Sequence, residues 1–166
     1  MVVDNRKDFI VVGSKTVIGY KEMFPLIRSG AMFIGATNAS SFITNYEHLN
    51  NKNIFIKDGV RYAKFGNIGW FTSFNVHKND YLQLTKEYNE SEYPKYDNCN
   101  AINVDKTKDI PKDYYNIMGV PITFLDKYNQ NQFEIVGFRK GDDGKDLRIG
   151  GKDKFSRVLI KRKGVM

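Results

Sequence analysis

One strand–helix–strand pattern near the start of the chain restricts the fold more than any other feature. Residues 9–12 form a short apolar run that ends at Gly13 and predicts a buried strand. Apolar residues then recur at helical spacing up to residue 27, with Pro25 expected in the first turn or at a kink and Gly30 ending the helix. Residues 31–35 predict a second strand. Such a βαβ unit implies a right-handed parallel crossover, and a single unit cannot close a doubly wound sheet.

From about Thr37 the pattern changes to short strands. The strongest hairpin signal is Asp58-Gly59 between the apolar runs 54–56 and 60–62, because Asp-Gly tolerates the positive φ of a tight turn. The polar and aromatic stretch 88–96 contains Pro94 and predicts a loop. Further strands are predicted at residues 69–74, 101–104, 133–138 and 157–160. The chain is therefore predicted to be α/β at its start and mostly β, with many loops, behind.

The composition is that of a folded protein. The chain has 166 residues, of which 41% are hydrophobic and 14% aromatic, which is too much for a solvated tail. No apolar run approaches the roughly 20 residues of a membrane span, and the polar start is no secretory signal. Cys99 is the only cysteine, which excludes an internal disulfide. We therefore expect a soluble, cytoplasmic protein without membrane association.

The positive charge is concentrated near the C-terminus. Of the formal net charge of +7, residues 139–163 carry +6, from ten basic and four acidic side chains. A cationic end on a nearly neutral body is typical of a protein that binds a polyanion, because each neutralised phosphate releases counterions. A solvated lysine-rich surface has the same composition. Six residues of this segment are candidates for phosphate contacts: Arg139, Lys140, Lys145, Arg148, Lys152 and Lys154.

Catalytic and metal-binding motifs are weak. His48 and His77 have no second histidine or cysteine at ligand spacing, so no metal is expected, and Cys99 has no positioned histidine. Gly-Ser-Lys-Thr at residues 13–16 resembles the end of a phosphate-binding loop, but Asp8 stands where the first glycine is needed. We therefore discount a nucleotide site there.

Residues 93–98, Tyr-Pro-Lys-Tyr-Asp-Asn, combine aromatic, basic and hydrogen-bonding side chains. Such a set can stack on an unpaired base or contact phosphates and base edges. A turn fixed by Pro94 and by Asp97 bonding its own backbone explains the same residues. On the first interpretation, Lys95, Tyr96, Asp97 and Asn98 contact DNA or a flipped base.

Five segments are distinctive together and occur in a fixed order: residues 20–27, 93–98, 106–111, 118–125 and 132–134. This series resembles the C-terminal half of the EcoRI family of DNA adenine-N6 methyltransferases. The resemblance runs from Phe9 to about Lys163. It implies methyl transfer from S-adenosylmethionine to the exocyclic amine of adenine in double-stranded DNA, in a bacterial restriction-modification system.

The sequence departs from this family in two elements. Members need a glycine-containing loop for the cofactor and an Asn-Pro-Pro-Phe loop for the target adenine, which must first leave the duplex. The sequence has neither loop. The Asn-Pro-Pro-Phe loop is excluded because the four prolines are never adjacent. We therefore expect a fragment that is inactive alone and needs a complementing N-terminal methyltransferase piece. No catalytic residue is assigned, and the cofactor-binding residues stay unknown.

The resemblance predicts two regions. Residues 1–37 would be the C-terminal βαβ piece of a Rossmann-like catalytic sheet, and residues 38–166 a mostly β, loop-rich DNA-recognition region. Such a piece would leave an apolar sheet edge unpaired unless a partner covers it. Two other functions stay open at this point. One is a stand-alone DNA-binding remnant without catalysis, and the other is an unrelated RNA-binding protein that uses Tyr93, Tyr96 and the basic segment.

Overall fold

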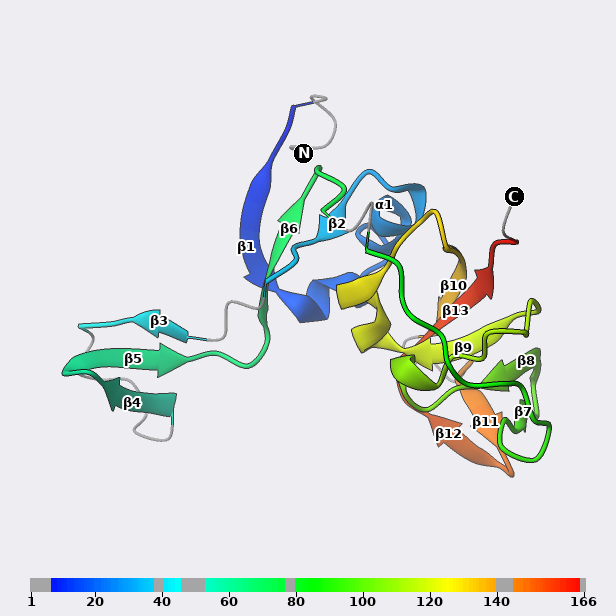
Figure 1. Cartoon of the computed structure of the whole chain (residues 1–166). Helices are drawn as coiled ribbons and strands as arrows, with labels where there is room; N and C mark the ends of the chain where they lie inside the picture. The colour runs from blue at the N-terminus through cyan, green and yellow to red at the C-terminus, as the bar shows by residue number, and fades with distance from the viewer. Residues whose placement is uncertain (1–6, 38–40, 46–52, 77–79, 140–144, 165–166) are drawn as a thin grey trace.

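The computed structural model describes residues 7–37, 41–45, 53–76, 80–139 and 145–164. Figure 1 shows a small sheet near the N-terminus, a larger sheet near the C-terminus, and a three-stranded arm that projects away from both. The fold is mixed α/β, with mostly strands and few helices. Within these ranges, no helix has the length and apolar character needed to cross a membrane.

The small sheet has the order β1-β6-β2, with β6 antiparallel to both neighbours. Strands β1 and β2 therefore run in the same direction, and β6, from much later in the chain, lies between them. The predicted strand–helix–strand segment is present, but its two strands are not adjacent. The elements are β1 (Ile10–Ser14), η2 (Lys15–Gly19), α1 (Phe24–Ser29), β2 (Phe33–Ile34) and β6 (Ile68–Thr72).

Helix α1 begins and ends as the sequence predicts. Pro25 lies in its first turn, where a missing N–H costs nothing, and Gly30 follows its last residue with φ 74°. The Gly30 N–H donates to the carbonyl of Ile27. The Phe24 ring stacks on Phe138, with 5.0 Å between centroids, so α1 is fixed against the C-terminal part of the chain.

The prediction that residues 9–12 form a buried strand is wrong. Ile10, Val11 and Val12 lie in strand β1 but are 64%, 42% and 47% exposed. The reason is topological: β1 pairs with β6 on one side, and no strand of the described chain pairs with its other side. An apolar run therefore forms the edge of the small sheet rather than its centre.

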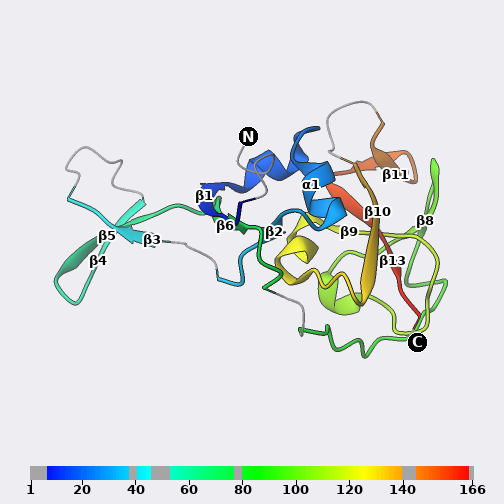
Figure 2. The same ribbon diagram turned by 90° about the horizontal axis from the view of Figure 1, so that it is seen from above.

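The projecting arm is a three-stranded antiparallel sheet in the order β3-β5-β4. The predicted hairpin is confirmed: β4 (Ile54–Lys57) and β5 (Val60–Lys64) are joined by Asp58 and Gly59, with φ values of 52° and 75°. Strand β3 (Ser41–Ile43) pairs with β5 on its other side. In both views the arm lies apart from the rest of the molecule (Figures 1 and 2).

The larger sheet has five strands in the order β10-β13-β9-β8-β7, with β8 and β9 parallel and the other neighbours antiparallel. A separate hairpin joins β11 to β12. The elements are β7 (Lys95–Tyr96), β8 (Cys99–Asn103), η4 (Thr107–Asp109), β9 (Met118–Pro121), η5 (Ile122–Lys127), β10 (Phe133–Arg139), β11 (Leu147–Ile149), β12 (Lys152–Lys154) and β13 (Arg157–Arg162).

Four further strands agree with the sequence prediction, and five short strands were not predicted. Strands are present at β6, β8, β10 and β13, where residues 69–74, 101–104, 133–138 and 157–160 predicted them. Strand β7 occupies the end of the predicted loop at residues 88–96. The strands without a sequence prediction are β3, β7, β9, β11 and β12.

One continuous core joins the small sheet to the five-stranded sheet. Ile34 and Phe71 of the small sheet belong to the same buried cluster as Ile102 and Phe133. Phe124, fully buried, meets the Phe133 ring edge-on with 5.2 Å between centroids. The predicted division between residues 1–37 and 38–166 stays a prediction, and the described core crosses it.

Candidate nucleic-acid interface

The turn between β7 and β8 holds the β11–β12 hairpin. The Asp97 carboxylate accepts hydrogen bonds from the N–H groups of Gly150 (3.2 Å) and Gly151 (2.8 Å), and its own N–H donates to the Arg148 carbonyl at 2.8 Å. The two glycines have φ values of 57° and 73°, as a tight two-residue hairpin turn requires. One carboxylate therefore fixes the tip of the hairpin.

Asn98 fixes the base of the same hairpin. Its Nδ2 donates to the Asp146 carbonyl at 2.6 Å, and its Oδ1 accepts from the Arg148 N–H at 3.1 Å. In the described chain, the side chains of Asp97 and Asn98 thus hold the β11–β12 hairpin in place. Their contact with DNA stays a prediction.

Tyr96 lies inside the protein. Its ring is 5% exposed, its hydroxyl donates to Asn103 Oδ1 at 2.8 Å, and Gly119 lies against the ring. Burial raises the pKa of Tyr96 to about 12, in spite of the nearby Arg157 guanidinium. The hydroxyl is therefore a neutral donor at physiological pH, and in the described conformation the ring offers no free face for a base.

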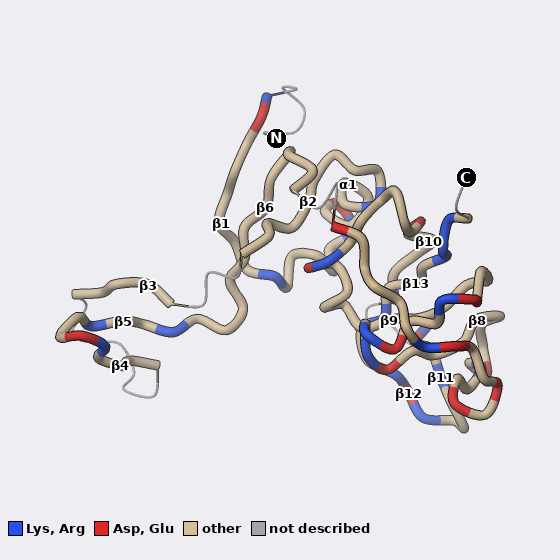
Figure 3. Tube along the Cα trace, viewed as in Figure 1, with Lys and Arg blue, Asp and Glu red and all other residues tan. Residues whose placement is uncertain are grey.

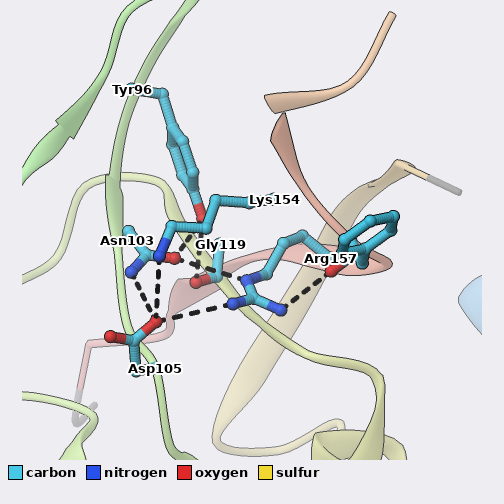
Figure 4. Close-up of polar contacts among 7 residues, drawn as sticks. Tyr96, Asn103, Asp105, Gly119, Lys154 and Arg157 are labelled. Atoms are coloured by element: carbon cyan, nitrogen blue, oxygen red, sulfur yellow. Dashed lines mark hydrogen bonds and ion pairs between the residues drawn. The ribbon is translucent and has the colours of Figure 1, made fainter. Parts of the chain in front are cut away.

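Asn103 connects Tyr96 to charged residues (Figure 4). Its Oδ1 also accepts from Arg157 Nε at 3.3 Å, and its Nδ2 donates to Asp105 Oδ1 at 2.8 Å. The hydrogen bond from Asn103, and then the nearby Lys154 and Arg157, hold the pKa of Asp105 below its ordinary value. The Asp105 carboxylate lies 3.8 Å from Lys154 Nζ and 3.5 Å from Arg157.

Arg157 links this network to the turn between β12 and β13. One guanidinium nitrogen donates to the Phe155 carbonyl at 2.9 Å, across Ser156 with its φ of 29°. The Phe155 side chain is 75% exposed. The network thus supports a turn that carries an exposed aromatic ring next to Lys154.

Besides Lys154, which lies beside Asp105, two further predicted DNA-contacting cations have carboxylate partners. Lys95 is exposed and pairs with Glu90 at 2.9 Å, and Arg148 pairs with Asp153 at 2.7 Å on the same hairpin. These interactions raise the pKa values of both cations. Exposed ion pairs are weak, so phosphate groups could compete for both side chains.

The other basic candidates surround the same hairpin. Arg139 ends β10 opposite Arg157, Lys145 precedes β11, and Lys152 and Lys154 lie on β12. Lys140 lies outside the described residues. Figure 3 shows that acidic residues are interspersed with the cations of this region. The structure therefore brings several predicted cations together, in a region whose net charge is reduced by carboxylates.

A small hollow of about 320 Å³ lies after β2, and its lining is polar. Nearby, Lys15 Nζ donates to Asp126 Oδ1 at 2.8 Å, and Ser14 Oγ accepts the Thr16 N–H, so residues 13–16 form a strand end and a 3-10 turn rather than a phosphate-binding loop. The described residues provide neither an aromatic wall nor a glycine-rich loop there, so the hollow does not fit S-adenosylmethionine. It is lined by Gly35, Ala36, Thr107, Thr123, Asp126 and Lys127.

The described residues contain no group of three or more His, Cys, Asp or Glu side chains that could hold a metal ion. His48 and His77 lie outside those residues. Cys99, half-buried on β8, is a free thiol. The features of the described chain that remain as candidates for a binding site are the β11–β12 hairpin and the surface around it.

Comparison with known proteins identifies the family. The family model for the adenine-specific methyltransferase EcoRI matches residues 1–163. The chain belongs to the EcoRI methyltransferase family. The chain is 46% identical to the Type II methyltransferase M.EcoRI of Escherichia coli over 95% of its own length and 51% of the relative's. No solved structure matches it.

Two mycoplasma proteins extend this family relationship. The chain is 33% identical to the Type II methyltransferase M.MgeORF184P of Mycoplasma genitalium, covering 99% of the chain and 60% of that protein. It is 32% identical to M.MpnI of Mycoplasma pneumoniae, covering 98% and 59%. The chain thus spans between half and three fifths of the length of these relatives.

The structure adds residues that the sequence did not single out. Asn103, Asp105 and Arg157 form the polar network beneath the hairpin, and Phe155 is the exposed aromatic at its end. A polar residue at a strand position expected to be apolar, such as Asn103 on β8, was the available signal. The arm around β5 was predicted as a hairpin within the proposed DNA-recognition region, but none of its residues was named as a candidate site residue.

Proposed function

We propose that the chain is the C-terminal part of a DNA adenine-N6 methyltransferase. The whole enzyme would transfer a methyl group from S-adenosylmethionine to adenine in a double-stranded site, as the cytoplasmic modification enzyme of a bacterial restriction-modification system. The family match over residues 1–163 carries this proposal. Its partners would be duplex DNA and a complementing N-terminal piece, without any membrane.

The 166 residues are proposed to be inactive alone. They contain no Pro-Pro pair, and hence no Asn-Pro-Pro-Phe loop to receive the adenine amine. The hollow after β2 has the wrong lining for S-adenosylmethionine. The complementing piece would therefore supply both the cofactor pocket and the target-base loop, while this chain contributes DNA contacts.

The free edge of β1 is the proposed junction with the complementing piece. Ile10, Val11 and Val12 expose apolar side chains on a strand with one unpaired side in the described chain. An unpaired apolar edge favours addition of another strand, because backbone hydrogen bonds and apolar burial are gained together. The edge thus supports the expectation that this sheet continues in a larger protein.

Methyl transfer measured with a labelled sulfonium donor tests the proposal. We expect no incorporation into plasmid DNA by the chain alone, and incorporation when a polypeptide with the two missing loops is added. Incorporation by the chain alone would contradict its inactivity. A melting temperature that rises on addition of S-adenosylmethionine to the chain alone would contradict the missing pocket.

A stand-alone DNA-binding remnant is the second candidate. The absence of both loops together with a C-terminal segment of net charge +6 favours it. It predicts that the chain binds duplex DNA without cofactor and that log affinity falls steeply with log salt concentration. Failure of every complementing piece to restore methyl transfer, with duplex binding intact, would favour the remnant over the enzyme part.

A further inference from the structure

The β3-β5-β4 arm carries cations that differ from those of the C-terminal region. Lys57, Arg61 and Lys64 are exposed, and in the described part of the chain none of them is paired with a carboxylate. Asp58 is the one acidic residue within the three strands and their described turn. Around the β11–β12 hairpin, by contrast, Arg148 and other cations already have acidic partners.

The strand register places two of these lysines on one face of the arm. Lys57 of β4 lies opposite Val60 of β5. Alternate residues of a strand share a face, so Val60, Tyr62 and Lys64 lie on the same face as Lys57. Tyr62 is also opposite Phe55 on one side and Ile43 on the other. One face therefore has a lysine at each end and a row of Ile43, Tyr62 and Phe55 between them.

The apolar row on this face is partly open to solvent. Ile43 is 68% and Phe55 40% exposed, and the Phe55 ring stacks on Tyr62 with 5.3 Å between centroids. The arm projects from the body of the molecule, and the small sheet and the five-stranded sheet both lie away from it (Figure 2). A ligand that covers this apolar row would also have to carry negative charge, because a lysine lies at each end of the row.

The dimensions of this face match a DNA groove. Val60 and Lys64 are four residues apart on one strand, which places the two lysine ends roughly 13 Å from each other. The major groove of B-DNA is about 12 Å wide, admits a β-ribbon and exposes thymine methyl groups. Lysines at the two ends could thus reach phosphates on both walls, with the apolar row at the base edges.

A protein occupant fits this face less well. Lysines are depleted from the cores of protein interfaces, and burying Lys57 and Lys64 without acidic partners would be costly. A second copy of the arm would bring like charges together. Phosphates, in contrast, neutralise the same cations. The charge on the arm therefore favours duplex DNA.

We propose that the β3-β5-β4 arm is a second DNA-binding element that enters the major groove. In this arrangement, Lys57 and Lys64 bind phosphates on opposite walls of the groove. Ile43 and Phe55 contact base edges, where a thymine methyl is the complementary group. The inference rests on the proposed function, because it requires duplex DNA to be the ligand of the chain.

The test is the salt dependence of duplex binding by the full chain, measured by fluorescence anisotropy with a labelled 30-base-pair duplex. The variant Lys57→Ala/Lys64→Ala should bind more weakly, with a slope of log affinity against log salt that is shallower by about 2. The matched control is Lys21→Ala/Lys108→Ala, which removes the same charge from exposed lysines outside the arm. Its slope should stay that of the original chain. The variant Lys57→Arg/Lys64→Arg should restore the slope.

The base-edge contact has its own variant. Ile43→Ser should weaken duplex binding several-fold and leave the salt slope unchanged, because it removes an apolar contact and no charge. Circular dichroism of each variant checks that the strands remain folded. An affinity equal to that of the original chain would contradict the proposed position of the apolar row.

The outcomes separate the arm from the proposed function. If the chain binds no duplex at all, the DNA-related function fails. If it binds duplex and Lys57→Ala/Lys64→Ala behaves like the control, the arm proposal is overturned and the function stands. If the arm variant alters self-association or complementation but not DNA binding, a protein occupies the arm, and the proposal is also overturned.

Discussion

The Asp97 carboxylate accepts a 2.8 Å hydrogen bond from the Gly151 N–H, although 54 positions separate the two residues in the chain. This bond connects a turn of the five-stranded sheet to the tip of a basic hairpin. A hairpin of two three-residue strands is marginal alone, so its position depends on such contacts from outside.

Replacing Asp97 with Ala should therefore release the hairpin. We expect the free energy of unfolding to fall by about 1 kcal/mol, because two backbone donors lose their acceptor. Amide exchange at Gly150 and Gly151 should become faster, as measured by NMR. Asp153→Ala is the matched control, since this carboxylate lies on the same hairpin and bonds Arg148 instead. Unchanged exchange in Asp97→Ala would contradict the role assigned to the carboxylate.

Gly119 should not tolerate a larger residue. A Cβ at this position would lie 2.9 Å from Cε2 of the buried Tyr96 ring. We expect Gly119→Ala to lower the free energy of unfolding by about 1–3 kcal/mol, measured by urea denaturation. At Gly137 the Cβ would meet only Leu159, at 3.8 Å, so Gly137→Ala should cost less. Equal losses for the two variants would be evidence against close packing at Tyr96.

The buried Tyr96 hydroxyl should make stability depend on pH in the alkaline range. The pKa of Tyr96 is about 12 in the folded chain and 10 ordinarily. The contribution of its neutral hydroxyl to the free energy of unfolding is therefore complete below pH 10 and is lost as the pH rises from 10 towards 12. Tyr96→Phe should cost about 1 kcal/mol at pH 7, through the lost hydrogen bond, and less at pH 11. Urea denaturation at both pH values measures this, with the exposed Tyr20→Phe as control. A deficit that does not shrink at pH 11 would disprove the assignment.

The edge of β1 should promote association of the isolated chain. Ile10 and Val12 are exposed on the same face of β1, which pairs with β6 on one side and with no described strand on the other. Charged residues on such edges prevent strand addition. We expect Ile10→Lys/Val12→Lys to reduce concentration-dependent association in sedimentation velocity, with roughly 0.5 kcal/mol or less change in stability. The control variant is Ile43→Lys/Ile56→Lys, which places the same charges on exposed apolar residues of the arm instead of on the β1 edge. Equal association by all three chains would argue against the edge.

The cations of the β11–β12 hairpin make a separate prediction on DNA binding. Arg148→Ala/Lys152→Ala should make the salt slope of duplex binding shallower by about 2 if both side chains contact phosphate. Asp153→Asn should have the opposite effect on affinity, because it frees Arg148 from its carboxylate partner. An unchanged slope in the double variant would remove these two residues from the interface.

The sequence predicted elements that local rules determine. The Asp58-Gly59 turn has the two positive φ values that a short hairpin needs, and Pro25 and Gly30 mark the ends of α1. The longer strands, such as β10 and β13, were predicted because their apolar runs are long enough to stand out. These features depend on residues a few positions apart.

The features that were missed depend on distant residues. Val11 was expected to be buried, but its exposure depends on β6 being the only described neighbour of β1. Tyr96 was expected at a surface, yet it is covered by Gly119 and bonded to Asn103. The three-residue strands β11 and β12 are specified by Asp97 and Asn98, some 50 positions earlier. The Gly150-Gly151 pair is a local hairpin signal, but the contacts that hold the hairpin in place come from distant residues.

The shared core has a consequence for how this chain can be divided. Ile18, Ile27, Met32 and Ile34 come from the first 37 residues and pack in the same cluster as Met118, Phe133 and Ile160. A gene rearrangement that exchanged the first 37 residues for those of another protein would have to preserve this packing. The first 37 residues and the segment that holds the basic hairpin are therefore expected to be inherited as a unit.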